Sequence, residues 1–203
     1  MLGPMSRVAA PRPRFISQQI TTGASVSSLN ATAPVTIREN NLLFAVITLQ
    51  SGSTVTMTAS PTGWTILNPS PNRWVCYKKA TNSEPASYTF TFSASVTNIS
   101  IGILNYSNAK IDVIGTVSGT ATNPTATGIT VSRNKAIAIL ALTVNTSGTT
   151  VTDPIGWNNR IRRVTTSSLL LYDKWVEAGA TGNVAVTSSN SASRAQLFSI
   201  IFN

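Results

Sequence analysis

Short apolar runs separated by Gly, Pro, Asn and Ser recur along the whole chain and predict strands rather than helices. In residues 42–47 (LLFAVI) both alternating sets of positions are apolar, which is typical of a central strand covered on both faces. Residues 88–92 (YTFTF) alternate between aromatic and polar side chains, as in a half-buried strand. No segment has a convincing amphipathic helical period. The pattern therefore predicts an all-β protein.

The two halves of the chain repeat one another at an offset of about 94 residues. Residues 34–49 (PVTIRENNLLFAVITL) align with residues 128–143 (GITVSRNKAIAILALT), and PTGW at 61–64 aligns with PIGW at 154–157. The alignment pairs Asn40 with Asn134, Trp64 with Trp157, and Tyr77 with Tyr172. Each copy contains about six or seven short predicted strands, as expected of antiparallel sandwiches and barrels.

The repeat divides the chain into a basic arm at residues 1–14, a first β-sandwich repeat at residues 15–106 and a second at residues 107–203. The arm holds three arginines, three prolines and no acid, so we expect a flexible extended segment that orders against a partner; the alternative is a disordered tail without a role. Only residues 107–110 separate the two copies, which is too short for a linker. The predicted fold is an all-β antiparallel β-sandwich, jelly-roll or immunoglobulin-like, of two pseudo-repeats packed together with an extended N-terminal arm.

Composition narrows the chemistry that the protein can perform. The chain of 203 residues is 42% hydrophobic and 10% charged, with one cysteine and no histidine. Neither a zinc site nor a Ser-His-Asp or Cys-His nucleophile can be assembled from these residues, and no cofactor is expected. Cys76 lies in an apolar run, which favours a buried structural thiol. The one grouping of acids with catalytic potential, Asp153 with Asp173 or Glu177, has no spacing that recommends it, so we expect a protein that is not an enzyme.

No run approaches the roughly 20 apolar residues of a membrane span, and the N-terminus lacks the apolar stretch of a signal peptide. The expectation is a protein made in the cytoplasm that does not bind membranes. The formal net charge of +9 is spread along the chain rather than concentrated, which argues against a specific nucleic-acid partner.

Six arginines are the candidate partner-binding residues. Three belong to the arm and three form a dense cluster after the second PxGW turn: Arg7, Arg12, Arg14, Arg160, Arg162 and Arg163. The cluster suits phosphates or an acidic protein surface, and its alternative is a solvated edge strand protected by charge. The matched Trp64 and Trp157 are candidates either for hydrophobic plugs at the ends of the sandwich or for carbohydrate-stacking platforms.

A series of motifs, most of them in the first copy, carries a resemblance to a known family. PTGW is followed by a strand that ends in YKKA, by NSEPASYTFTFS at residues 82–93, and by an apolar-Asn-Tyr corner before Ile111 and Asp112. This order resembles a β-sandwich module of structural proteins of tailed bacteriophages over roughly residues 34–143.

The resemblance implies a virion component without an active site. It favours a capsid decoration (cement) protein over a head fibre or tail-associated subunit, with the major capsid protein or other virion subunits as partners. A homo-oligomer is expected, localised in the virion after synthesis in the host cytoplasm. The alternative is a tail- or fibre-associated carbohydrate-binding module that recognises host glycans through Trp64, Trp157 or exposed tyrosines.

Overall fold

The computed structural model describes residues 12–50, 55–70, 72–144, 150–165, 167–189 and 193–203. Within these ranges the chain contains strands, turns and bends but no helix, and all the strand pairings are antiparallel. The predicted all-β fold is confirmed. The described part of the chain accordingly contains no helix long and apolar enough to cross a membrane.

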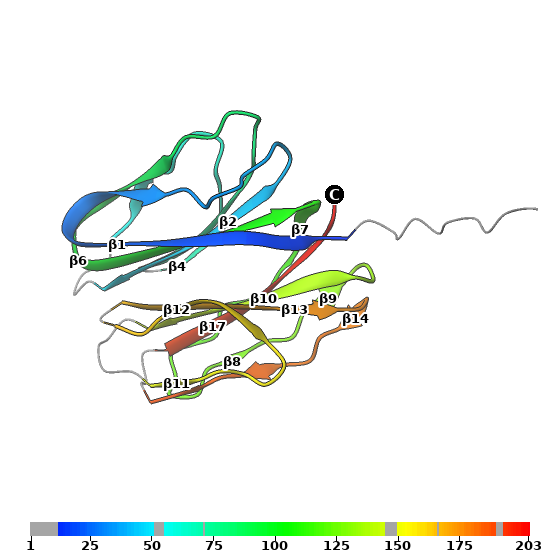
Figure 1. Cartoon of the computed structure of the whole chain (residues 1–203). Helices are drawn as coiled ribbons and strands as arrows, with labels where there is room; N and C mark the ends of the chain where they lie inside the picture. The colour runs from blue at the N-terminus through cyan, green and yellow to red at the C-terminus, as the bar shows by residue number, and fades with distance from the viewer. Residues whose placement is uncertain (1–11, 51–54, 71, 145–149, 166, 190–192) are drawn as a thin grey trace, which may run out of the picture.

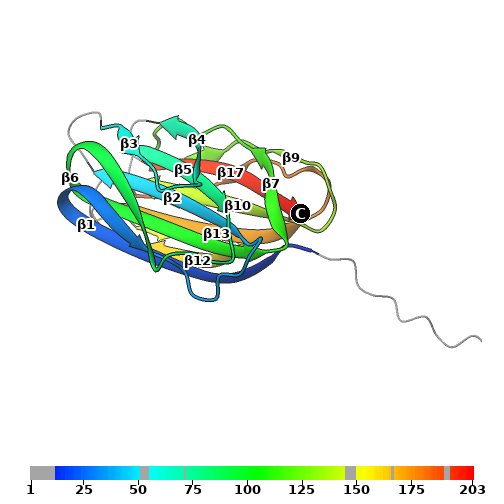
Figure 2. The same cartoon turned by 90° about the horizontal axis from the view of Figure 1, so that it is seen from above.

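The first half of the chain forms one sheet (Figure 1). Its strands are β1 (Arg14–Thr32), β2 (Leu42–Gln50), β3 (Met57–Ala59), β4 (Thr65–Ser70), β5 (Arg73–Lys79) and β6 (Ser87–Ser107). Their order is β1-β6-β2-β5-β4, and β3 pairs with β6 outside this path. β1 and β6 pair from Arg14↔Ser107 to Thr32↔Ser87, with a register shift between Val26 and Ser28. This long ribbon curls at one end, so that its far part covers the outer face of its own sheet (Figures 1 and 2).

The second half forms a five-stranded sheet and three small two-stranded sheets. The strands of the large sheet are β7 (Ala109–Ile114), β10 (Ala136–Val144), β12 (Asn158–Arg163), β13 (Ser168–Val176) and β17 (Ser193–Phe202), in the order β7-β17-β10-β13-β12. The small sheets pair β8 (Thr125–Ala126) with β15 (Val184–Ala185), β9 (Thr130–Val131) with β14 (Gly179–Ala180), and β11 (Val151–Thr152) with β16 (Thr187–Ser188). The two large sheets stack as the two layers of a sandwich (Figure 1).

The strand order of the two large sheets is equivalent. β1, β6, β2, β5 and β4 of the first half correspond in position to β7, β17, β10, β13 and β12 of the second. Both PxGW turns close in the same way, because the Trp64 and Trp157 amides donate to the carbonyls of Pro61 and Pro154 (3.2 and 3.3 Å). Gly63 and Gly156 have φ of 82° and 79° in these turns, a left-handed conformation that glycine adopts without steric strain.

Two of the paired positions differ between the copies. Tyr77 packs against the apolar cluster between the sheets, whereas Tyr172 belongs to the cluster on the outer face of the second sheet. Their sequence pairing is therefore wrong as a structural equivalence, because an offset of one residue moves a strand side chain to the opposite face. In the turn before the central strand, the left-handed residue is Asn40 in the first copy but Lys135 in the second.

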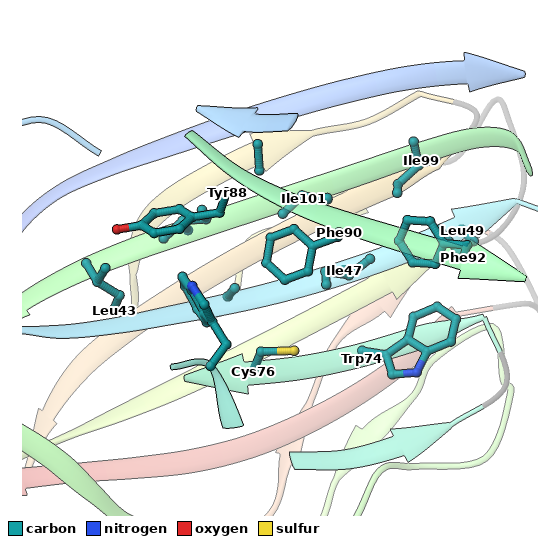
Figure 3. Packing of buried hydrophobic residues seen from close by; sticks show 14 of the residues in the cluster. Leu43, Ile47, Leu49, Trp74, Cys76, Tyr88, Phe90, Phe92, Ile99 and Ile101 are labelled. Carbon is teal, nitrogen blue, oxygen red and sulfur yellow. The ribbon is translucent and has the colours of Figure 1, made fainter. Parts of the chain in front are cut away.

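The core has three apolar layers. A central cluster between the sheets includes Phe44, Leu104, Ile139 and Phe198, and the rings of Phe44 and Phe198 meet edge to face at 5.1 Å. The outer cluster of the first half, on the face of the sheet away from the second, gathers the side chains labelled in Figure 3. A third cluster lies on the outer face of the second sheet. β2 and β10 are buried on both faces from 42 to 49 and from 136 to 144, as the apolar run at 42–47 predicts.

Candidate functional site

The two arginine groups of the sequence meet at one edge of the sandwich. β1 and β12 are edge strands of the two sheets, and they contact each other along the same side of the molecule. The arginines on this side, which we call the basic edge, are Arg12, Arg14, Arg160, Arg162 and Arg163. The sixth candidate, Arg7, lies outside the described residues.

Arg160 is committed to a buried network that joins the sheets. Its Nε donates to Asp173 Oδ2 at 2.8 Å, and its guanidinium lies 4.0 Å from the centroid of the Phe15 ring on β1. The hydroxyl of Tyr106, on β6 of the first sheet, donates to the same carboxylate oxygen at 2.9 Å. Burial and then the charge of Asp173 raise the pKa of Tyr106 well above its ordinary value. Arg160 therefore holds β1 and β6 against β13 and is not free for a partner.

Arg162 is partly committed as well. Its guanidinium pairs with Asp153 and also donates to the Val151 carbonyl at 2.9 Å. Burial alone would raise the pKa of Asp153, but hydrogen bonds from Tyr172 and Asn159 and the charge of Arg162 lower it below the ordinary value. The Arg162 side chain is about 42% exposed, so a partner can still reach it.

Asp153, Asp173 and Glu177, the acids that the sequence groups together, have different hydrogen-bond partners. Asp173 bonds to residues of the central layer, whereas Asp153 accepts from Tyr172 on the outer face of β13 at 2.7 Å. Glu177 accepts from the backbone amide of Lys135 at 3.3 Å. Each of the three carboxylates thus has its own set of partners. In the described part of the chain, no group of three or more His, Cys, Asp or Glu residues is placed to hold a metal ion.

Arg163 faces a small polar recess between β1 and the segment before β13. The recess measures about 230 Å³, and Thr22, Asn98, Ser100 and Ser167 are among its lining residues. Ser100 Oγ donates to the Ser167 carbonyl at 2.7 Å, which closes one wall. A single guanidinium among hydroxyl and amide groups suits the carboxylate or carbonyl of a partner side chain.

Arg12 and Arg14 form the solvent-facing part of the basic edge. Arg12 lies over the ring of Trp175, 4.9 Å from its centroid, and Trp175 is 46% exposed. Pro13 between them is buried, and Arg14 is already the first residue of β1. The folded body therefore begins earlier than the expected boundary after residue 14, and residues 1–11 lie outside the description. Arginine and tryptophan are the side chains most enriched at the energetic centres of protein interfaces.

The matched tryptophans have different environments. Trp64 is 7% exposed and packs edge to face against Tyr88 and Phe90, at 5.1 and 5.8 Å, so it plugs the outer cluster of the first half. Trp157 is half-buried beside an open recess of about 430 Å³. The ammonium of Lys174 covers one face of the Trp157 ring at 4.9 Å from its centroid.

Sequence reasoning missed two residues. Trp175 has no counterpart in the first copy, so the repeat gave no reason to single it out, and only folding brings it to Arg12. Arg73 is the first residue of the apolar run RWVCY. A cation at the start of a buried strand is unusual, and this signal could have identified Arg73 from the sequence. Comparison of the chain with protein-family models, with curated proteins and with solved structures finds no match.

Proposed function

We propose that this protein is a non-enzymatic structural subunit of a tailed-phage particle, a capsid decoration protein that attaches through the basic edge. The observation that carries the proposal is the contact of Arg12 with the exposed Trp175, two residues before the exposed Arg14 at the start of β1. The virion assignment rests on the resemblance of the PTGW to NSEPASYTFTFS segment. The attachment surface rests on the geometry.

The chemistry of this surface favours an acidic protein partner. Arg12 and Arg14 are exposed, and neither takes part in the three ion pairs found among the described residues. The stack on Trp175 orients the Arg12 guanidinium before binding, which lowers the entropy lost when it pairs with a carboxylate. An acidic shell surface around an apolar patch would complement all three side chains.

Co-sedimentation with expanded, undecorated phage shells tests the proposal. Wild-type protein should bind saturably, with a fixed copy number per shell. Combined R12A and R14A substitutions should weaken binding at least tenfold, because they remove the exposed charges. Trp175→Ala should weaken it by a similar factor. The matched control is Lys110→Ala, which removes an exposed cation from β7 at the opposite edge of the second sheet and should leave binding unchanged.

Two results would overturn the proposal. The first is an absence of saturable binding to the shells, and the second is equal binding by the arginine variants and the Lys110 control.

A second candidate, glycan binding, is favoured by one observation. The recess beside Trp157 combines an indole with polar side chains, among them Asp153, Lys174 and Asn183. Lys174 covers one ring face, so a sugar would have only the other face for stacking. Retention on a glycan array that is lost in Trp157→Ala but kept in Trp175→Ala would favour this function over shell attachment.

A further inference from the structure

One end of the space between the two sheets is polar and cationic. In the first sheet, the residues in register across β1, β6, β2 and β5 are Thr22, Ser100, Thr48 and Arg73. In the second sheet, the residues in register across β12, β13, β10 and β17 are Arg163, Leu169, Thr143 and Arg194. Apart from Leu169, these rows contain no large apolar side chain, in contrast to the layers next to them.

Arg73 and Arg194 both point into this space. Arg73 alternates along β5 with Val75 and Tyr77, which pack in the central cluster. Arg194 lies on the same face of β17 as Phe198, which packs there too. The two guanidinium groups are close enough for their charges to interact. Arg73 of the first sheet therefore faces Arg194 of the second.

Arg73 is almost completely buried, with 3% of its surface exposed. Its Nε, Nη1 and Nη2 atoms are all buried, and none has a hydrogen-bond partner among the described residues. Burial and then the charge of Arg194 lower the pKa of Arg73 to about 9, so the group still carries its charge at neutral pH. Burying a charge without a counterion or hydrogen bonds costs several kcal/mol of folding free energy. Native proteins therefore pair such groups.

The chain has no acidic side chain to spare for this position. It has six acidic residues, and all of them are described. Their contacts or positions are as follows: Glu84 pairs with Lys78, Asp153 with Arg162 and Asp173 with Arg160, Asp112 accepts from Ser132 and Ser199, Glu177 accepts from Lys135, and Glu39 is exposed ahead of β2. Arg73 pairs in register with Thr48, near the far end of β2 from Glu39. A counterion must therefore come from outside the chain.

We propose that Arg73 and Arg194 bind a small inorganic oxyanion, phosphate or sulfate, between the two sheets. The planar guanidinium of Arg73 presents a fork of N–H donors that matches two oxygens of such an anion. Thr48 and Thr143, which are both buried, lie in register beside the two arginines and bring hydroxyl groups to the same end. A small free anion fits better than a partner's carboxylate, because a partner side chain would have to enter the space between the sheets. The anion would fasten β5 of one sheet to β17 of the other.

The test measures sulfate and phosphate binding by calorimetry, with the ionic strength held constant by chloride. Wild-type protein should bind one oxyanion per chain. Arg73→Met should weaken that binding at least tenfold, and the control Arg38→Met, at an exposed arginine in the turn before β2, should not change it. Sulfate should also raise the Tm of the wild type above its value in chloride, with no such rise in Arg73→Met.

Crystals soaked in selenate give a readout that needs no variant. An anomalous peak within about 3 Å of an Arg73 nitrogen is expected. Absence of that peak, binding no stronger than in matched chloride, or equal binding by wild type and Arg73→Met would each overturn the site. None of these results bears on shell attachment, because Arg73 lies between the sheets and not on the basic edge.

Discussion

Removal of the Asp173 carboxylate is expected to loosen the contact between the two sheets. Asp173 is 2% exposed and accepts from Tyr106 Oη (2.9 Å), Arg160 Nε (2.8 Å) and Asn158 Nδ2 (3.2 Å). Tyr106 belongs to the first sheet and the other three residues to the second. In Asp173→Ala, the Tyr106 hydroxyl stays buried without its acceptor, and Arg160 loses its counterion.

The magnitude follows from these two losses. An unsatisfied buried hydroxyl costs about 1–3 kcal/mol, and breaking a buried ion pair costs about 3–5 kcal/mol when the remaining charge stays dry. The Arg160 side chain is 26% exposed and can regain part of its hydration, so the lower end of that range applies. Together the two losses should lower the free energy of unfolding of Asp173→Ala by about 4–6 kcal/mol. Tyr106→Phe keeps the carboxylate and its other donors, and should cost about 1.5 kcal/mol.

Urea unfolding followed by tryptophan fluorescence measures both values, because urea does not screen the ion pair as guanidinium chloride would. The double variant should cost about 1–2 kcal/mol less than the sum of the single variants, since Tyr106→Phe removes the hydroxyl that Asp173→Ala leaves unsatisfied. The control is Glu177→Ala, at an exposed acid directly after β13, which should change stability by less than about 0.5 kcal/mol. A cost below about 1 kcal/mol for Asp173→Ala, or strict additivity with Tyr106→Phe, would refute the role of this network.

Three further outcomes are expected. Trp64→Ala should cost about 3–5 kcal/mol in urea unfolding and the half-buried Trp157→Ala less than half as much; equal costs would contradict the difference in their packing. Burial alone would raise the pKa of Glu84, but hydrogen bonds from Lys78 and its other donors lower it below the ordinary value. The ionised Glu84 therefore stabilises the fold above the unfolded-state pKa, and this stabilisation is lost as the pH falls through the lower folded-state pKa. The free energy of unfolding should therefore fall more steeply below about pH 4.3 in wild type than in Glu84→Gln, and identical slopes would argue against this contribution. Cys76 is fully buried, and burial raises its pKa to about 12, so iodoacetamide should alkylate it only in denaturant; labelling of the native protein at the rate of a free thiol would be inconsistent with the packing in Figure 3.

The apolar pattern and the repeat carry most of the information about this fold. They place a central strand at 42–47, align residues 34–49 with 128–143 and predict two similar halves, because burial on both faces and turn-forming residues leave local signatures in a sequence. The pairing of Tyr77 with Tyr172 failed because sequence similarity does not fix the register of a strand to within one residue.

The candidate site was only partly predictable. Arginine clustering identifies Arg160 and Arg162, but the sequence does not reveal that their carboxylate partners stand 13 and 9 positions away. The approach of Arg12 to Trp175 and of Arg73 to Arg194 depends on how the two sheets stack. Such contacts between distant segments have no local periodicity, so only the fold defines them.

The strand order also constrains how the chain is completed during synthesis. Every strand pairing in the described ranges stays within residues 14–107 or within residues 109–202, and in each half the last strand lies between the first strand and the central one. The first sheet can therefore close as soon as β6 has left the ribosome, whereas the second must wait until β17 (Ser193–Phe202) has been made. In that interval the inner face of the first sheet, with Phe44 and Leu104, is exposed to water and to other nascent chains. A chain released before residue 193 would contain the complete first sheet but lack β17 of the second. The exposed inner face of its first sheet could then pack against the same face of another copy.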